Sequence, residues 1–440
     1  MRRRKQGRVH SRGRIFLCAG ALALMLASSS IHASSPVADA AMKGDAATVR
    51  TLVRQGADVN EAQADGMTAL HWAALNGDLK TIEVLLVAGA MMEPLTRVGG
   101  YTPLHLASSR GHAPVVARLL EAGCKPLILT ATGVQAIHLA AQAGSADAIR
   151  VLIDRGADVN TRDNTHGRTP LVFAASQNRL EAMRMLIEKG ANSRLETTVI
   201  DYGQRSAADN AARSARDKVI TATTGKAPTA PPQFDPPQTG RGATVGGQAA
   251  PDPAAAAGRG RGAAGNPNGP RALSDIQQIG RQGGLTALHY VAREGFVDAA
   301  MMLLDSGLDV NLPTAGDRST PLLVAIINGH YDLAMAFIKR GANPNITSDD
   351  GAGPLFVALN NEWALRTWYP QPTAATQQRA SHIDLMEALL QAGADPNART
   401  VSHIWYAAYN AGRMGVDYTG ATPLWRAAYS LDVAAMRLLV

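Results

Sequence analysis

Small and apolar residues alternate with polar turns in a pattern that recurs along most of this chain. Threonine before a Pro-Leu pair is suited to cap a helix, because proline at the first helical position lacks an N–H that would be unpaired anyway. Small residues such as Ala73 and Ala74 follow, which lets a short helix lie close to its neighbours. Ile82, Val84 and Leu85 then mark a second, more apolar helix. The pattern predicts pairs of short helices.

The pairs repeat at a nearly constant interval, which can be followed from Thr68 through Thr102 and Gln135 to Thr169. Each unit closes with Gly-Ala-Asp-Val-Asn or a variant of it, as at 56–60. The glycine is suited to end the second helix in a left-handed conformation, and the residues after it turn the chain into a loop. Because one pair cannot bury its own apolar face, neighbouring pairs are expected to stack.

A period of about 33 residues, with Thr-Pro-Leu-His at 102–105 and Gly-Ala-Asp-Val-Asn at 156–160, resembles the ankyrin repeat. The resemblance implies an all-α ankyrin-repeat solenoid of stacked helix-turn-helix units with protruding turns, interrupted by a disordered Gly/Pro/Ala-rich insert. We count nine units, of which the last is incomplete at Val440, and we expect the native chain to continue or to have been truncated there. The predicted organisation is a signal peptide at 1–33, repeats 1–5 at 34–200, a low-complexity linker at 201–283 and repeats 6–9 at 284–440.

Two segments interrupt the pattern. The stretch 225–270 is rich in Gly and Pro, with only Phe234 and Val245 as large apolar residues, so it cannot bury a core and is predicted to be disordered. We favour looping out of one continuous stack over a hinge between two blocks. Aromatic-rich insertions at 362–380 and 401–418 are predicted to be the most specific part of a binding surface. The alternative is that their rings pack together as a satellite core.

The segment 1–33 contains seven basic residues, an apolar stretch from Ile15 to Ala27 and a small residue at Ala33. This is the layout of a secretory signal peptide, and the apolar stretch is too short to span a bilayer. Those basic residues account for the whole formal net charge of +7. We therefore expect cleavage after Ala33, a secreted or periplasmic location, no transmembrane segment after cleavage and no nucleic-acid partner.

Residues that could carry chemistry have structural explanations. His71, His105, His138 and His289 recur at one position, and in ankyrin-like units this histidine bonds backbone between neighbouring turns. No metal site is therefore predicted. Cys124 stands at the alanine place of a turn, where a small buried residue is wanted, so a reactive thiol is not expected. Nucleophile, metalloenzyme and phosphate-loop signatures are not found. These observations predict a protein that is not an enzyme and uses no cofactor.

Ankyrin-like stacks bind through turn tips and the inner face of the first helices, and the resemblance implies that role here. We expect a non-catalytic, monomeric protein-protein interaction scaffold of the cell envelope with a protein partner. The alternatives are the recognition arm of a larger envelope enzyme or electron carrier, or a cell-surface polymer binder. Candidate partner-binding residues are Met67, Leu75, Asn76, Tyr101, Arg110, Gln142, Arg168, Gln177, Arg293, Trp363, Trp368, Tyr369, Trp405 and Tyr406.

Overall fold

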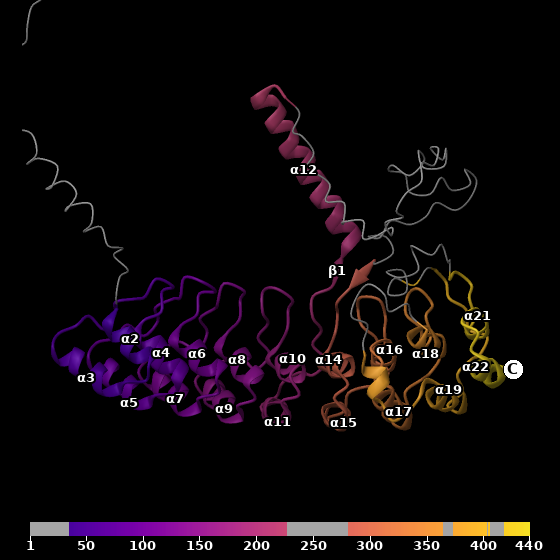
Figure 1. Cartoon of the computed structure of the whole chain (residues 1–440), viewed down its shortest axis with the longest axis horizontal. Coiled ribbons are helices and arrows are strands. Elements are labelled where there is room, and N and C mark those ends of the chain that lie inside the picture. The colour runs from indigo at the N-terminus through magenta and orange to yellow at the C-terminus, as the bar shows by residue number, and fades with distance from the viewer. Residues whose placement is uncertain (1–34, 227–279, 364–372, 403, 405–417) are drawn as a thin grey trace, which may run out of the picture. The chain divides into compact units, whose positions relative to one another are not determined.

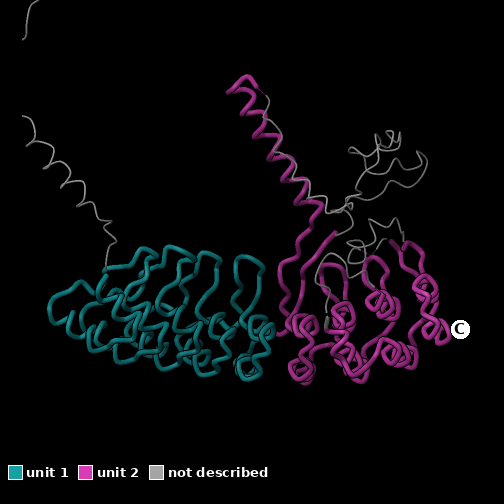
Figure 2. Tube along the Cα trace, in the orientation of Figure 1, with its two compact units in different colours: residues 1–192 teal, residues 193–440 magenta. Residues whose placement is uncertain are grey.

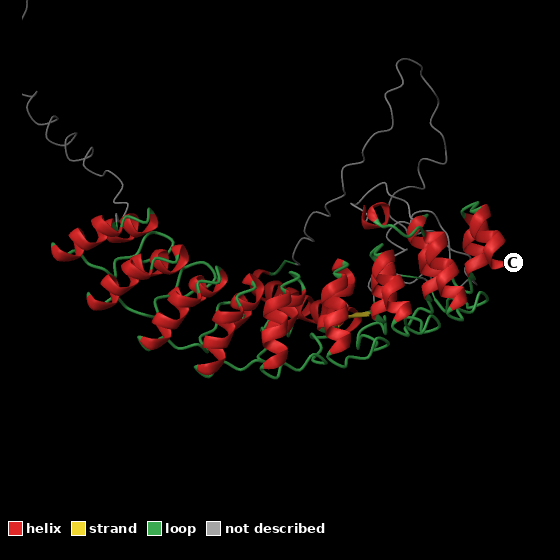
Figure 3. Ribbon diagram, turned by 90° about the horizontal axis from the view of Figure 1, so that it is seen from below, coloured by secondary structure: helices red, strands yellow, loops and turns green. Residues whose placement is uncertain are grey.

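The computed structural model describes residues 35–226, 280–363, 373–402, 404 and 418–440. It divides into two compact units, residues 1–192 and 193–440, which Figure 2 colours separately. Within the described residues, nine pairs of short helices are joined by protruding turns (Figures 1 and 3). The predicted all-α architecture of stacked helix pairs is confirmed.

Unit 1 holds five of these pairs, in each of which a first helix is followed by an antiparallel second helix. First helices stack on first helices, and second helices on second helices. The apolar side chains between them form the core, and Leu70, Ile82 and Leu85 have no exposed surface. The first helices are α2 (Pro36–Met42), α4 (Ala69–Asn76), α6 (Pro103–Ser109), α8 (Ala136–Ala143) and α10 (Pro170–Ala175); the second helices are α3 (Ala46–Arg54), α5 (Leu79–Val87), α7 (Ala113–Glu121), α9 (Ala146–Asp154) and α11 (Leu180–Glu188).

Unit 2 repeats the arrangement with four described pairs and adds short elements between them. Its core includes Tyr331 and Phe337, which are at most 1% exposed. The pairs are α14 (Ala287–Glu294) with α15 (Val297–Asp305), α16 (Pro321–Ile327) with α17 (Tyr331–Lys339), α18 (Pro354–Glu362) with α19 (His382–Gln391), and α21 (Pro423–Tyr429) with α22 (Val433–Leu439). The 3₁₀ helix η2 (Thr373–Gln377) precedes α19.

The helix boundaries follow from capping residues. The Thr68 side chain accepts a hydrogen bond from the backbone N–H of His71, which satisfies a donor that the first turn of α4 leaves open. Gly77 ends α4 with a φ of 73°, in the left-handed region that favours glycine. Gly56 has a φ of 82° just after α3, as the Gly-Ala-Asp signature predicts. Each of these helix ends is therefore fixed by local chemistry.

The long interruption begins and ends at a short pair of strands. Strand β1 (Ile200–Asp201) pairs antiparallel with β2 (Arg281–Gln282), and the Thr197 backbone N–H donates to the Leu285 carbonyl over 2.9 Å. After β1 comes α12 (Tyr202–Thr224), a helix of 23 residues without a buried side chain. Asp201 caps it by accepting from Gln204 N. A linker is predicted for these residues, so the helix was not expected; its alanines at 207, 208, 211, 212 and 215 favour helix formation.

Several sequence predictions concern residues outside those that the structure describes. The signal segment 1–33 with its cleavage point, most of the predicted disordered stretch, and Trp368, Tyr369, Trp405 and Tyr406 lie outside the described residues. Over the part of the chain that the structure does describe, no helix has both the length and the apolar character required to cross a bilayer.

Candidate functional site

The first helices α4 and α6 of unit 1 each leave one face partly exposed, whereas every residue of α10 is buried. In α4, Leu70 and His71 are buried, whereas Trp72 and Leu75 are half-buried and Asn76 is exposed. Equivalent positions in the other first helices produce two rows, which together we call the first-helix face. The inner row is Trp72 and Leu106, which are half-buried, with Leu139 and Phe173, which are buried; the outer row is Leu75, Asn76, Ser109, Arg110, Gln142 and Gln177.

The predicted residues of the outer row lie on this face, and two of them are already engaged. Asn76 Nδ2 donates to the Ala41 carbonyl over 3.0 Å, which ties the face to the preceding pair. The Gln142 side chain is exposed, although its carbonyl accepts from Arg179 Nε over 3.1 Å. Arg110 and Gln177 are also exposed. The outer row therefore presents mainly amide and guanidinium groups.

The predicted turn-tip residues are less available. Met67 is only 8% exposed, so the expectation of an accessible tip side chain is wrong at this position. Arg168 donates Nε and an Nη to Asp163 at 2.9 and 2.8 Å, and its guanidinium lies 4.6 Å from the centre of the Phe173 ring. Tyr101 is half-buried, with its ring edge-to-face with His105. These side chains stabilise the turns.

Two predicted residues of unit 2 also have internal partners. The Arg293 guanidinium bonds Glu294 at 2.9 Å and lies 4.7 Å from the centre of the Tyr290 ring. Trp363 is 44% exposed, and its Nε1–H donates to Asp432 Oδ2 over 2.9 Å. Both side chains are thus partly committed to packing within unit 2.

Asp432 joins the last two described pairs of unit 2. Its Oδ2 lies 2.9 Å from His382 Nε2 and also accepts from Trp363, while Oδ1 caps α22 by accepting from Ala435 N. Burial alone would raise the pKa of Asp432, but the hydrogen bonds from Ala435, Trp363 and His382 bring it below its ordinary value. This cluster has the hydrogen bonding of a packing contact.

The recurrent histidines bond backbone, as the sequence predicts. His105 Nδ1 accepts from Thr102 N over 3.1 Å, and Nε2 lies 3.0 Å from the Ile128 carbonyl in the next turn. This arrangement requires the neutral ring with its proton on Nε2. Burial lowers the pKa of His105, His138 and His289 to about 4, and it also lowers the pKa of His71. These neutral rings therefore link the backbones of successive repeats.

Asparagines link the turns that follow the second helices. Asn160 Oδ1 accepts from Asn192 N over 2.7 Å, and its Nδ2 donates to the Gly190 carbonyl over 3.4 Å. Asn60, Asn311 and Asn345 make the same two bonds to the next turn. At the equivalent place after α7 stands Leu127, whose side chain is 52% exposed and cannot form either bond. The series of asparagine bonds between successive turns, which we call the asparagine ladder, is therefore interrupted at this turn.

Cys124 is the one free cysteine among the described residues, and it is buried. Its thiol lies 3.6 Å from the Met92 carbonyl. Burial, with a smaller contribution from Glu93, raises the thiol pKa to about 12. Because the thiolate is the nucleophilic form, Cys124 is unsuited to nucleophilic chemistry. Among the described side chains, no three His, Cys, Asp or Glu residues converge as a metal site would require.

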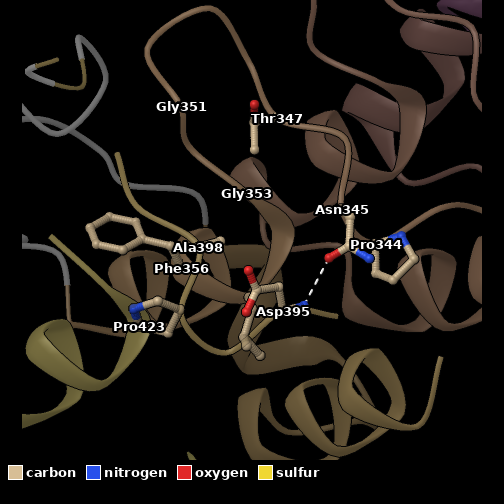
Figure 4. Close-up of a pocket in the computed structure, with 10 residues that line it drawn as sticks. Pro344, Asn345, Thr347, Gly351, Gly353, Phe356, Asp395, Ala398 and Pro423 are labelled. Atoms are coloured by element: carbon tan, nitrogen blue, oxygen red, sulfur yellow. Dashed lines mark hydrogen bonds between the residues drawn. The ribbon is translucent and has the colours of Figure 1, made fainter. Parts of the chain in front are cut away.

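A small pocket of about 300 Å³, open solvent included, lies between two turns of unit 2. Pro344, Phe356 and Pro423 provide apolar walls, and Asn345 Oδ1 accepts from Asp395 N over 2.8 Å across it (Figure 4). Asp395 is the single ionisable residue among those that line it. General acid-base catalysis needs a positioned proton donor and acceptor, which this lining does not supply.

The inner row of the first-helix face is the part that sequence reasoning missed. Trp72, Leu106, Leu139 and Phe173 occupy the position directly after the recurrent histidine or its equivalent. That position carries a large apolar residue in each case, which is half-buried in α4 and α6 and buried in α8 and α10. The combination of a fixed register and a variable side chain is the signal that could have identified it.

Comparison with known proteins agrees with this architecture. A model of the family described as ankyrin repeats (3 copies) matches residues 37–129, 122–197 and 265–366. The palmitoyltransferase Hip14 of Drosophila melanogaster is 34% identical over 191 residues, covering 36% of this chain and 30% of that protein. Palmitoyltransferase ZDHHC13 of Homo sapiens is 34% identical over 126 residues, 29% of this chain and 20% of the relative. The ankyrin repeat protein nuc-2 of Neurospora crassa is 29% identical over 187 residues, 35% and 17% of the two chains. The matches thus span less than a third of the length of each of these relatives.

These relatives correct two expectations. A non-enzymatic scaffold of the cell envelope is wrong, because similar proteins are named as palmitoyltransferases, which are enzymes. A search for signatures within one chain cannot detect an activity that longer relatives carry. A secreted or periplasmic protein of bacterial type is wrong on the same finding, since the relatives are animal acyl-transfer enzymes and a fungal ankyrin repeat protein.

Proposed function

Because the chain belongs to the ankyrin-repeat family, we propose that its first-helix face binds a segment of another protein, and that this binding serves a protein acyl-transfer reaction of the kind for which its relatives are named. The observation that carries the proposal is the first-helix face itself. It places the half-buried apolar side chains of Trp72 and Leu106 beside the exposed amide and guanidinium groups of the outer row. A surface with apolar contacts and a polar rim is typical of protein recognition.

The chemistry of Cys124 supports a recognition role for the described residues within such a reaction. Transfer of an acyl group through a protein thiol needs a thiolate. The raised pKa and burial of Cys124 keep that thiol protonated at neutral pH. The proposed activity therefore depends on groups other than Cys124, and the first-helix face selects the protein that is brought to them.

The proposal is tested by photo-cross-linking coupled to an acylation assay. A photoreactive residue at Ser109, on the outer row, is compared with one at Arg155, which follows second helix α9. We expect a protein partner to cross-link at Ser109 and not at Arg155. That partner is then incubated with the full chain and an alkyne-labelled palmitoyl-coenzyme A. Label on the partner that depends on the chain supports acyl transfer; equal cross-linking at both positions would refute recognition by the first-helix face.

A further inference from the structure

We propose that three exposed leucines on two neighbouring turns of unit 1 form a second docking surface, separate from the first-helix face, which binds an amphipathic helix with acidic residues beside its apolar face. Leu95 lies in the turn between α5 and α6, and Leu127 and Leu129 lie in the turn between α7 and α8. We call these three residues the leucine patch. The inference goes beyond the proposed function, because no residue of the patch belongs to a first helix.

Exposed apolar side chains of unit 1 gather at these two turns. Seven large apolar residues among the described residues of unit 1 are exposed, and six of them lie between 87 and 129. Within the patch, Leu95 is 55% exposed, Leu127 52% and Leu129 45%. Exposed apolar residues are normal when they are scattered singly, but contiguous ones mark interaction sites. The concentration therefore indicates a binding surface.

Hydrogen bonds hold the two turns side by side at both ends of the patch. The Lys125 N–H donates to Glu93 Oε1 over 2.9 Å, and the Ala131 N–H donates to the Gly99 carbonyl over 2.9 Å. Each leucine of the patch lies between these two links along its own turn. The three side chains therefore stand on adjacent stretches of backbone, which follow α5 and α7 (Figure 1).

Neighbouring turns carry small or polar residues at the same positions. Leu95 and Leu129 each precede the residue whose N–H closes its turn, and Ala62 and Arg162 hold that place in the turns on either side. Leu127 stands where the asparagine ladder would have an asparagine, so two inter-turn hydrogen bonds are given up there. An exposed leucine that forgoes hydrogen bonds within the fold is typical of a position kept for function at some cost in stability.

The backbone of these turns is already used within the array. The N–H groups of Thr96 and Thr130 donate across their own turns at 3.0 and 2.9 Å. The Ile128 carbonyl, between the two leucines of the second turn, lies 3.0 Å from His105 Nε2. An added strand binds through main-chain hydrogen bonds, whereas an amphipathic helix lays its apolar side chains on an apolar surface. Because the patch offers side chains, it favours a helix.

Cations without carboxylate partners border the patch. The two turns, 88–102 and 122–135, contain only Glu93, Arg97 and Lys125 as charged residues, and Lys125 Nζ lies 3.5 Å from the Glu93 carboxylate. Arg97, together with Arg162 in the next turn, is exposed, and neither forms an ion pair with another described residue. Complementary charge favours acidic residues beside the apolar face of the partner helix.

The pair of Glu93 and Lys125 favours a protein partner over a lipid surface. The pair lies at one end of the patch, and immersion in lipid would remove water from both charges, which is costly. A protein contact has a polar, hydrated rim around its apolar centre. A helix can therefore cover the leucines while this ion pair stays in water.

Binding of three synthetic peptides of equal length to the full chain, measured by fluorescence anisotropy, tests the inference. The first has leucine at positions i, i+3, i+4 and i+7 of a helix, with glutamate on the other face. The second has the same composition with its leucines spread around the helix, and the third has lysine in place of glutamate. We expect the first to bind roughly tenfold more tightly than either of the others. Equal affinity for the first and second peptides would overturn the amphipathic match, and equal affinity for the first and third would overturn the charge argument.

Matched variants locate the site. L127N and L95A install residues that other turns of the array carry at these positions, so both are expected to fold. Each should weaken binding of the first peptide by roughly tenfold. M42A, which shortens an exposed apolar side chain at the end of α2, should leave binding unchanged. Unchanged binding in both leucine variants would overturn the location of the site.

The L127N variant also separates binding from stability. We expect it to raise the thermal midpoint while weakening the first peptide; a lowered midpoint with unchanged binding would make Leu127 a structural residue and overturn the inference. Other occupants of the patch would give different results. Vesicles containing phosphatidylserine that sediment the unaltered chain but not L127N, or a dimer in light scattering that L127N abolishes, would overturn the helix as occupant if the first peptide does not bind. Cross-linking at Ser109 should be the same in L127N, so failure here and failure of the proposed function are distinguishable.

Discussion

Lowering the pH from 7 to 5 is expected to destabilise unit 1 through its buried histidines. Each histidine has a pKa near 6.5 in the unfolded chain, whereas burial lowers the pKa of His105 and His138 to about 4 in the fold. Between these values the unfolded state binds more protons than the folded state, so stability falls as pH falls. At pH 5 the loss is roughly 2 kcal/mol for each of the two rings.

The structure gives two causes for this loss. The rings are at most 1% exposed, so a positive charge would be poorly solvated. In addition, Nδ1 of His105 accepts from Thr102 N, and protonation of Nδ1 would place two donors against each other. Asp163 also makes the fold less stable as pH falls, but only at a lower pH than the histidines do. Burial alone would raise the pKa of Asp163, but hydrogen bonds from Arg168 and His166 bring it below the ordinary 3.8. The histidines therefore dominate between pH 6.5 and 5.

Hydrogen exchange with mass spectrometry, followed on peptides from 103–143 as a function of pH and denaturant, measures this stability directly. H105N removes one titrating ring while keeping a polar side chain. We expect it to lower stability at pH 7 and to reduce the slope of unfolding free energy against pH by about 1.4 kcal/mol per pH unit. L119A is the control, since it removes buried methyl groups without removing a titrating group. An unchanged slope in H105N would refute the assignment of the pH dependence to these rings.

Three further predictions follow from single contacts. L127N should allow both inter-turn hydrogen bonds, to the Gly156 carbonyl and from the Asp158 N–H, and raise the unfolding free energy by roughly 0.5–1.5 kcal/mol in denaturant titrations. An unfolding free energy that stays the same or falls would show that the missing asparagine bonds do not reduce stability at this turn. L152A should cost about 2–5 kcal/mol by forming a cavity, because Leu152 is fully buried, and a loss below about 1 kcal/mol would contradict tight packing. Cys124 should resist iodoacetamide at pH 8 in the folded chain and react on unfolding; modification of the native protein at the rate of an exposed thiol would contradict its raised pKa.

The helix pairs could be predicted from the sequence because their signals are local. Thr68 caps α4, and Gly56 adopts its left-handed conformation after α3, and both depend on neighbours within a few residues. The histidine at 105 could be assigned to the backbone for a related reason, since its partner in the next turn is placed by the repeat itself.

Other features depend on contacts that a repeat pattern does not specify. The repeat pattern predicts Met67 at an accessible tip, but only 8% of its surface is exposed. The pattern predicts that Arg168 faces a partner, yet its guanidinium donates a hydrogen bond to Asp163, which lies earlier in the same turn. The helix α12 was not predicted because the Gly- and Pro-rich composition further along the insert was extended to its alanine-rich start. The enzymatic names of the relatives could not be inferred, because the segment shared with them is the repeat array and covers at most 30% of their length.

The short strands β1 and β2 have a consequence for how this chain can vary. They bring the two ends of the interruption together at adjacent backbone positions, Ile200 beside Gln282 and Asp201 beside Arg281. A flexible sequence inserted between ends paired in this way costs little, because each doubling of loop length adds only about 0.6 kcal/mol of loop-closure entropy. The segment between β1 and β2 is therefore a tolerant acceptor site, where a reporter domain or a longer natural insertion can be accommodated while α14 and the pairs after it keep their packing.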